Sequence, residues 1–382
     1  MVIFFLILLV TTLLFQNPLS VKGETSEKRF TITTTVTYSN NGTTDWDLTG
    51  EDYAISLFMN NSWQSVSLVE HSLPLNSNAT DGDGNLLGFL NLTQLSYNQS
   101  VSYAVKYEVV SKPRLLPNIT EEQSLTLADI NDTLKDEYCW KEGPWLQYSD
   151  DQDLRDLAYR ESSNETRVLS IVKNFVRWIT DYVVYDSAEI PRYPNETYIE
   201  RKGDCDDKAI LLITLCRIVG IPAYLQVGCI YDFFSLYSKE TYWQGHVTSV
   251  LKQIGWHGWA IVYVPPWGWL PVDLTYVPID PYLSNSLNAI KGAAVTGQDV
   301  IQYMNFTHTD YVGASRRLRD FIQSNDFYIY MIDEMKTNID FGSALEIVKL
   351  IFRGALIATA VIAILLATVL VYKSKRTTKL EP

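Results

Sequence analysis

The chain has 382 residues, of which 47% are hydrophobic and 13% aromatic, and its formal net charge at pH 7 is −13. This length and apolar content exclude a disordered chain and leave room for two or three domains with buried cores. Residues 1–372 carry 27 basic and 43 acidic residues, which argues against nucleic acid or anionic lipid as a ligand.

Residues 1–23 are predicted to form a signal peptide. The apolar run Val2–Phe15 has the length of the hydrophobic core of such a peptide, and polar and small residues follow it up to Gly23. No Lys or Arg precedes the run, which departs from the usual positively charged start. The position of the cleavage site therefore stays open.

Residues 24–112 are predicted to form an antiparallel β-sandwich domain. Three β-rich segments with alternating side chains occupy 30–38, 53–59 and 101–109, and clusters of Asn, Gly and Asp separate the strands. Such a domain is expected to act as a spacer or an interaction module.

The segment Asp81–Asn85 in this region resembles the start of a calcium-binding loop. Leu92 occupies the twelfth position, where that loop needs an acidic ligand. A hairpin turn between two strands is therefore the favoured prediction.

A linker that contains three prolines is predicted over residues 113–150, and a second domain over 151–310. Helical spacing of apolar residues predicts helices over 151–159 and 168–182. The following stretch, Pro191–Gly203, has two prolines and is predicted to be a surface loop.

The next helix is predicted to begin at Cys205. Asp204 is a suitable N-cap, two further aspartates lie in the first turn, and Gly220 and Pro222 mark the end. Five residues form a buried stripe at helical spacing: Ala209, Leu212, Ile213, Cys216 and Val219. Cys205 is therefore expected at the N-terminus of a helix that packs in the core.

Strands are predicted over 223–230, 259–264 and 269–274, and a turn at 265–268 joins the last two. Residues 232–255, between the first two strands, are rich in aromatic side chains and too long for a tight connection. They are expected to form either a lid or substrate cleft wall, or an ordinary packed loop.

A thiol, an imidazole and a carboxylate follow one another as Cys205, His257 and Asp273. A thiolate beside an imidazole that a carboxylate orients is sufficient for acyl transfer through a thioester. If the turn at 265–268 closes an antiparallel pair, the 16 residues between His257 and Asp273 bring both to the same end of the hairpin.

The helix N-terminus is expected to stabilise a Cys205 thiolate by about 0.3 to 2 kcal/mol. Asp204, Asp206 and Asp207 oppose this effect by charge repulsion. Helix position alone is therefore not expected to activate the thiol, and His257 must supply the deciding interaction. The backbone N–H of Cys205 is the expected first oxyanion donor, and no second donor is evident.

The remaining cysteines and histidines are weaker candidates. Cys216 lies on the buried stripe and is expected to have a packing role, whereas pairing between Cys139 and Cys229 stays open. His246 is a second possible base, but no strand and carboxylate follow it. No metal motif is present, and neither a metal nor a cofactor is expected.

Four segments carry a resemblance to a known family: 178–185, 200–209, 220–223 and 257–275. Together they resemble the transglutaminase-like superfamily of microbial proteins, over roughly residues 151–275. The resemblance implies a papain-like α+β fold. It also implies that Cys205 is the nucleophile, that His257 is the acid/base and that Asp273 orients the imidazole ring.

The C-terminal region is predicted to anchor the chain in a membrane. A juxtamembrane helical region is expected over 311–353, and residues 354–372 form an uncharged run of 19, long enough to span about 30 Å of hydrocarbon. The tail, 373–382, begins with basic residues and is expected in the cytoplasm, with everything before the span outside. A buried C-terminal helix is the alternative.

Ten Asn-x-Ser/Thr sequons favour the same topology and are candidate glycosylation sites in an exported, single-pass plasma-membrane protein. They are Asn41, Asn60, Asn78, Asn91, Asn98, Asn118, Asn131, Asn164, Asn195 and Asn305.

These features together predict a membrane-anchored cell-surface enzyme that uses a Cys-His-Asp triad to attack an amide of a protein or peptide, including those of the cell envelope. Peptide or isopeptide hydrolysis is slightly favoured over acyl transfer because a solvent-facing site admits water. A catalytically inert surface binding or envelope module that retains the fold is the alternative. Amidase action on glycans or cell-wall peptides is a third hypothesis.

Overall fold

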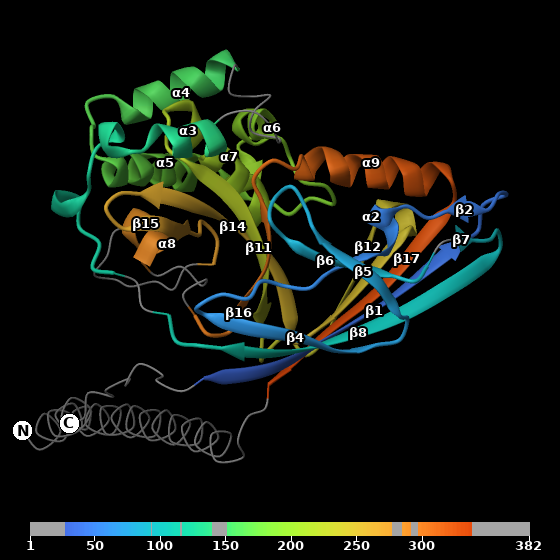
Figure 1. Ribbon diagram of the computed structural model, residues 1–382. Helices are drawn as coiled ribbons and strands as arrows, with labels where there is room; N and C mark the ends of the chain where they lie inside the picture. The colour runs from blue at the N-terminus through green and yellow to red at the C-terminus, as the bar shows by residue number, and fades with distance from the viewer. Residues whose placement is uncertain are drawn as a thin grey trace, which may run out of the picture. The chain divides into compact units, whose positions relative to one another are not determined.

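The computed structural model describes residues 27–92, 94–114, 117–139, 151–276, 285–291 and 297–337. One compact unit extends to Lys336 and contains nearly all of them. The predicted signal peptide, membrane span and cytoplasmic tail lie outside the described residues. Within these residues two large sheets, with helices packed against them, form the architecture (Figure 1).

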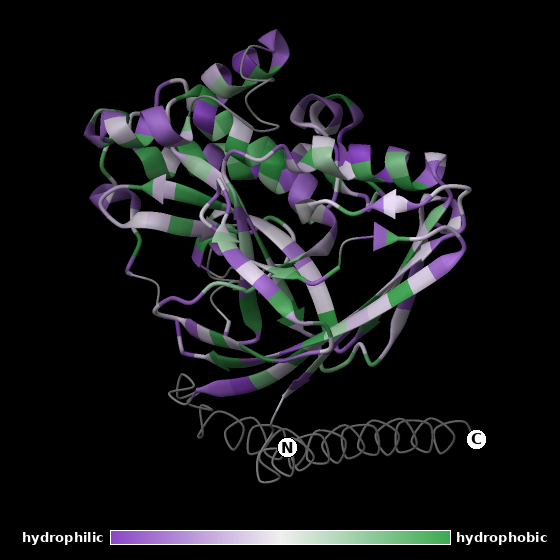
Figure 2. Cartoon of the chain, turned by 45° about the vertical axis from the view of Figure 1, so that its right-hand side comes forward, coloured by the Kyte–Doolittle hydropathy of each residue, from purple (hydrophilic) through white to green (hydrophobic). Residues whose placement is uncertain are grey.

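The first sheet has six strands in the order β12-β13-β17-β1-β8-β4. Its two longest neighbours, β1 and β8, are antiparallel from the pair Lys28↔Ser111 to the pair Asn40↔Gln99. Hydrophilic and hydrophobic residues alternate along these strands (Figure 2), as expected for a sheet with one face on a core. The strand bounds are Lys28–Asn40 (β1), Gln64–His71 (β4), Gln99–Ser111 (β8), Ser238–Tyr242 (β12), Val247–Lys252 (β13) and Phe327–Thr337 (β17).

A smaller antiparallel sheet shares an apolar core with the first one. It consists of β3 (Ala54–Ser56), β6 (Leu86–Leu90) and β5 (Leu75–Thr80), beside the short pair β2 (Trp46–Asp47) and β7 (Gln94–Leu95). Both sheets contribute buried side chains to this core. The turn at Asp81–Asn85 joins β5 to β6, so the predicted hairpin is confirmed.

The first sheet differs from the predicted sandwich because three of its strands come from beyond residue 237. β13 pairs in parallel with β17, and β17 in turn lies beside β1. Without these strands one edge of the 13-residue strand β1 would expose its backbone groups, and pairing removes that exposure. The aromatic insertion at 232–255 therefore forms an edge of the sheet through the hairpin β12–β13.

The second sheet has the order β15-β14-β11-β16 and is antiparallel throughout. The predicted strands and the turn at 265–268 are confirmed, with Ala260 opposite Val272 and Val264 opposite Gly268. The bounds are Ala223–Tyr231 (β11), Ile254–Val264 (β14), Gly268–Val272 (β15) and Val300–Phe306 (β16).

Helices pack against the second sheet around α7 (Cys205–Ile218), whose residues from Asp207 to Arg217 are all buried. The two predicted helices that precede it are confirmed as α4 (Gln152–Ser162) and α5 (Val168–Tyr182). Two shorter helices complete this part of the chain, α3 (Asp132–Tyr138) and α8 (Asn285–Lys291), besides the four-residue α2 (Gly50–Tyr53) near the first sheet.

The predicted surface loop at Pro191–Gly203 is wrong in part, since it contains helix α6 (Pro194–Glu200). Pro194 occupies the first turn, where its missing N–H costs nothing, and the Glu196 carboxylate accepts a hydrogen bond from the Tyr193 amide at 2.7 Å. On either side of α6, β9 (Val184–Tyr185) and β10 (Lys202–Gly203) pair in parallel.

The predicted helical region at 311–353 is confirmed for α9 (Tyr311–Ser324), but β17 follows it at Phe327–Thr337. The alternating aromatic and β-branched side chains of 327–332 suit a strand, and β13 and β1 provide its neighbours. Among the described residues, no helix is long and apolar enough to span a bilayer. The predicted span at 354–372 lies outside them.

Strand β14 joins the two cores. Ile254 packs in the core of the first sheet, whereas Val262 and Val264 pack in the core around α7. His257 lies between these two ends of the strand.

Replacing Gly228 with Ala is expected to destabilise the fold by about 1 to 3 kcal/mol, because overpacking a rigid interior displaces its neighbours. A Cβ at this position would lie 2.4 Å from the backbone oxygen of Ile301 and 2.6 Å from the Trp259 ring. Urea unfolding measures the change.

The matched control for this substitution is Gly82→Ala, where a Cβ meets nothing within 4 Å. Its free energy of unfolding should stay within about 0.5 kcal/mol of that of the unsubstituted chain. Equal stability of the two variants would contradict the close packing of β11 against β16.

Candidate active site

Cys205 is the first residue of α7 and is half-buried, with Asp204 as its N-cap. The predicted helix start is therefore confirmed. At the other end of the helix, Gly220 adopts a φ of +81°, a conformation that favours glycine and ends the helix where predicted.

His257 and Asp273 meet at one end of the β14–β15 hairpin, as the spacing predicts. The Nε2 atom of His257 lies 2.8 Å from Oδ2 of Asp273, and both side chains are buried. Because an ionised carboxylate only accepts hydrogen bonds, Nε2 is the nitrogen that carries the proton. In the described part of the chain, Nδ1 of His257 has no hydrogen-bond partner.

The Asp273 carboxylate is itself held in place. Its Oδ1 atom accepts hydrogen bonds from the backbone amides of Thr275 and Tyr276 at 3.0 and 3.1 Å. The Asp273 amide donates to the carbonyl of Ala289 at 2.9 Å. These contacts leave Oδ2 directed at the imidazole and fix the orientation of the ring.

The residue after His257 brings the hairpin to the thiol. The backbone N–H of Gly258 lies near the Cys205 sulfur and lowers the pKa of the thiol. A Cβ on Gly258 would lie 3.1 Å from Cβ of Asp206, closer than ordinary van der Waals contact, so glycine favours the close approach of the strand to the helix N-terminus. No hydrogen bond joins Cys205 and His257 in the structure as described; the side-chain contact of the thiol is with Oδ1 of Asp206 at 4.0 Å.

Burial raises the pKa of the Cys205 thiol, and the charges of Asp206 and Asp204 raise it further. The amides of Gly258 and Asp206 lower it. The helix position is thus outweighed, as expected, but burial is the largest cause and the opposing charges are those of Asp206 and Asp204 rather than of all three aspartates. The resting thiol is protonated at neutral pH.

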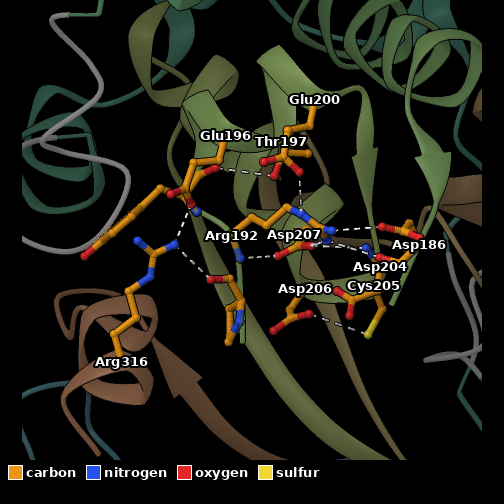
Figure 3. Close-up of polar contacts among 12 residues, drawn as sticks. Asp186, Arg192, Glu196, Thr197, Glu200, Asp204, Cys205, Asp206, Asp207 and Arg316 are labelled. Carbon is orange, nitrogen blue, oxygen red and sulfur yellow. Dashed lines mark hydrogen bonds and ion pairs between the residues drawn. The ribbon is translucent and has the colours of Figure 1, made fainter. Parts of the chain in front are cut away.

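Arg192 compensates part of this acidic cluster (Figure 3). Its backbone N–H and its Nη1 donate to the carboxylate of buried Asp207 at 2.6 and 2.8 Å. The same guanidinium pairs with Asp186 and Glu200. Burial and the Asp204 charge nevertheless raise the pKa of Asp207 to about 6.

Asp206 has a different environment. Burial raises its pKa well above the ordinary value, and a side-chain hydrogen bond with Asp204 raises it further. The phenol of Tyr311 also hydrogen-bonds this carboxylate. These contacts favour the protonated form of Asp206 beside the thiol.

Sequence reasoning missed both Arg192 and Tyr311. Arg192 lies in the segment predicted to be a surface loop, and Tyr311 begins a helix assigned to the juxtamembrane region. Neither position carries a local pattern that points to Cys205. Only the folded chain brings them to the acidic cluster.

A cavity of about 210 Å³ lies beside the N-terminus of α7. The insertion at 232–255 contributes a wall of it through β12, β13 and the short 3-10 helix η3 (Trp243–Gly245). This placement supports the cleft-wall prediction for the insertion. The lining residues are Ala188, Glu189, Pro191, Asp204, Asp206, Tyr242, Trp243, Val247 and Tyr311.

The other sequence candidates have structural roles. His246 is stacked on Tyr328, and its Nδ1 lies 2.7 Å from the carbonyl oxygen of Phe327. Cys216 is fully buried in the core around α7, as predicted. Cys139 and Cys229 are buried free thiols and form no disulfide in this structure.

Asp204, Cys205 and Asp206 offer ligand atoms that all lie within 4.8 Å of one another. Among the described residues this is the one cluster with the spacing of metal ligands. It coincides with the thiol site itself, and its carboxylates are bonded to one another and to Tyr311.

Residues 155–274 match the family model of the transglutaminase-like superfamily. This segment contains Cys205, His257 and Asp273. No curated protein matches the chain.

Three solved structures are similar to the chain. A candidate cysteine protease from Cytophaga hutchinsonii is 18% identical with a TM-score of 0.49, and the match covers 83% of this chain and 93% of that one. The periplasmic domain of TgpA from Pseudomonas aeruginosa, bound to ethylmercury, is 16% identical with a TM-score of 0.33, and the match covers 66% of this chain and 91% of that one. Legionella pneumophila LapG is 16% identical with a TM-score of 0.26, and the match covers 53% of this chain and 98% of that one.

The substitution Asp206→Asn is expected to lower the pKa of Cys205, because ionised Asp206 is the neighbouring charge that most raises this pKa. Burial raises the pKa of Asp206 itself, so the effect is expected above the pH at which Asp206 ionises. In that range, each unit by which the Cys205 pKa falls increases the thiolate fraction about tenfold. The pH dependence of iodoacetamide alkylation, with Cys205 identified by mass spectrometry, measures the change.

The matched control is Asp136→Asn on the exposed surface of α3, which should leave the alkylation profile unchanged. If the midpoint pH of alkylation in Asp206→Asn equals or exceeds that of the unsubstituted chain, Asp206 does not raise the pKa of the Cys205 thiol.

Proposed function

We propose that this chain is a thiol-dependent enzyme in which Cys205 attacks an amide carbonyl, His257 is the acid/base and Asp273 orients the imidazole. The observation that carries the proposal is the 2.8 Å contact between Nε2 of His257 and Oδ2 of Asp273, on the strand whose Gly258 amide lies near the Cys205 sulfur and lowers its pKa. The transglutaminase-like match over 155–274 supports the same chemistry.

The hydrogen bond to Asp273 places the imidazole proton on Nε2 and leaves Nδ1 as the basic nitrogen. Nδ1 takes the proton of the Cys205 thiol as the sulfur attacks the carbonyl carbon, and the oxyanion forms near the N-terminus of α7. The intermediate collapses to a thioester, while His257 protonates the departing amine. Water or a second amine then resolves the thioester.

The raised pKa of Cys205 has a consequence for this sequence of steps. Few molecules carry a thiolate before substrate binds, so proton transfer to His257 accompanies attack rather than preceding it. The imidazole is therefore essential to the reaction, and helix position contributes less.

The proposed substrate is a protein or peptide amide, including those of the cell envelope, and hydrolysis is favoured over acyl transfer. The cavity beside α7 argues against an anionic substrate, because the carboxylates of Glu189 and Asp204 line it. Because Cys205 is only half-buried, water reaches the site and is the simpler acceptor of the acyl group.

A catalytically inert surface module is the second candidate. One observation favours it: burial and two aspartates hold the thiol protonated. An inert module predicts no turnover and no change in thiol reactivity when His257 is replaced.

We further propose that the protein is exported and anchored at the plasma membrane by residues 354–372. Support comes from that uncharged run and from the positions of the sequons. Eight of the ten sequon asparagines are exposed, and two, Asn195 and Asn305, are half-buried.

Mapping of N-glycans by mass spectrometry on protein isolated from its native membrane tests this location. Glycans are expected at exposed asparagines such as Asn78 and Asn164. None is expected on Asn305, because its Oδ1 accepts a hydrogen bond from Gln226 at 2.8 Å. A chain without any glycan, or one modified at Asn305, would contradict the proposal.

Incubation of the full-length protein with a peptide library, with and without an added amine, tests the enzymatic proposal. Cleaved peptides indicate hydrolysis, and amine-linked products indicate transfer. Cys205→Ala should reduce turnover by about a million-fold, and Asp273→Asn by about ten-thousand-fold.

Cys139→Ala is the control, since this buried thiol lies on α3's end and outside the site. It should retain turnover. Activity that survives Cys205→Ala would eliminate the thiol mechanism, and a complete lack of turnover in the unsubstituted chain would favour the inert module.

A further inference from the structure

A second cavity, of about 390 Å³, lies on the face of the six-stranded sheet that α9 covers (Figure 1). Most of its wall is apolar, and aromatic rings from β1, β8, β14 and β16 and the segment after β3 contribute to it. Six of them are Tyr38, Phe58, Tyr103, Tyr107, Trp256 and Tyr303. Its volume falls within the range of small-molecule sites, about 300 to 1,000 Å³.

One carboxylate lines this apolar cavity. Asp333 on β17 is 4% exposed, and its Oδ1 accepts a hydrogen bond from Oγ1 of Thr34 at 2.6 Å. Its Oδ2 accepts from Nε1 of Trp256 at 2.9 Å. Both donors are neutral.

Within the described residues, no Lys, Arg or His forms an ion pair with Asp333, and no cation contributes to its pKa, which burial raises. A buried carboxylate without a positive partner is costly. The tyrosine hydroxyls of the cavity are engaged with other groups. Tyr107 donates to the carbonyl of Ser56, and Tyr38 interacts with Tyr103. No cation of the described residues pairs with this carboxyl group, so a cationic ligand that enters the cavity would pair with it and favour its ionised form.

Three of the rings that line the cavity with Asp333 contact one another. The ring centroids of Phe58 and Tyr303 are 4.7 Å apart, and those of Trp256 and Tyr303 are 5.0 Å apart. The faces of aromatic rings attract cations, and the attraction grows when water is excluded. A carboxylate beside several rings in an apolar cavity suits a cation that also carries an apolar group.

We propose that this cavity binds a small organic ammonium ion, whose charged nitrogen pairs with Asp333 and whose apolar body lies against Trp256 and Tyr303. This site is distinct from the thiol site and does not depend on the proposed chemistry of Cys205. The ligand is a free molecule with an alkyl or aryl group and one positive charge.

The ammonium site is nevertheless linked to the thiol site by three elements, β14, η3 and β13. Trp256 precedes His257 on β14, and Trp243 and Val247 line both cavities. A ligand against Trp256 therefore contacts the strand that carries the imidazole.

Titration of the full-length protein with hexylammonium, followed by isothermal calorimetry and tryptophan fluorescence, tests the proposal. Hexanol and hexanoate serve as neutral and anionic probes of the same apolar length. Saturable binding is expected, with affinity falling from hexylammonium to hexanol to hexanoate. The affinity for hexylammonium should exceed that for hexanol at least tenfold, which equals about 1.4 kcal/mol of binding free energy. Equal affinity for hexylammonium and hexanol would overturn the proposal.

Asp333→Asn preserves the size of the side chain and removes its charge. It is expected to weaken hexylammonium binding at least tenfold while changing hexanol binding little. The matched control is Glu334→Gln, the next residue of β17, which pairs with Lys336 outside the cavity and should bind hexylammonium as the original chain does.

Unchanged affinity for hexylammonium in a folded Asp333→Asn variant would contradict the proposed ion pair with Asp333. If that variant fails to fold in urea and circular dichroism tests, the order of the three probes on the unsubstituted chain still decides the proposal.

Cys205→Ala separates this proposal from the enzymatic one. It should bind hexylammonium with unchanged affinity although it lacks the thiol. Loss of binding in Cys205→Ala would show that the amine reacts at the thiol site and would overturn a separate site at Asp333.

Discussion

The contact between Gly258 and Asp206 is the constraint on which the rest of the site depends. At this point β14 comes so close to the N-terminus of α7 that a Cβ on residue 258 would lie 3.1 Å from Cβ of Asp206, closer than ordinary van der Waals contact. Because β14 is held in the core of the first sheet at one end and in the core around α7 at the other, the contact has little freedom to relax. His257 and the Gly258 amide are thereby placed beside Cys205.

The acidic residues around Cys205 set the conditions under which it can react. Asp207 is neutralised by Arg192, and Asp206 is driven toward its protonated form by burial and by Asp204. The thiol remains protonated despite its position at a helix N-terminus. Any reaction must then draw on the His257–Asp273 pair, whose geometry is fixed by the backbone amides after the hairpin.

The six-stranded sheet has a larger part in the molecule than that of a spacer. Its edge strands come from the aromatic insertion, which also lines the cavity beside α7. Its covered face holds the aromatic cavity with Asp333, and Trp256 joins that cavity to the strand that bears His257. Both cavities thus depend on strands that are distant in the sequence.

The sequence by itself determined α4, α5, α7, the β14–β15 hairpin and the meeting of His257 with Asp273, because these depend on local periodicity, caps and a short turn. Only the tertiary structure decided that β12, β13 and β17 complete the first sheet and that Arg192 and Tyr311 reach the acidic cluster. The tertiary structure also places Asp333 in a cavity lined by aromatic rings. Pairing of distant strands and burial of distant charges depend on contacts between residues far apart in the chain, and no local pattern encodes them.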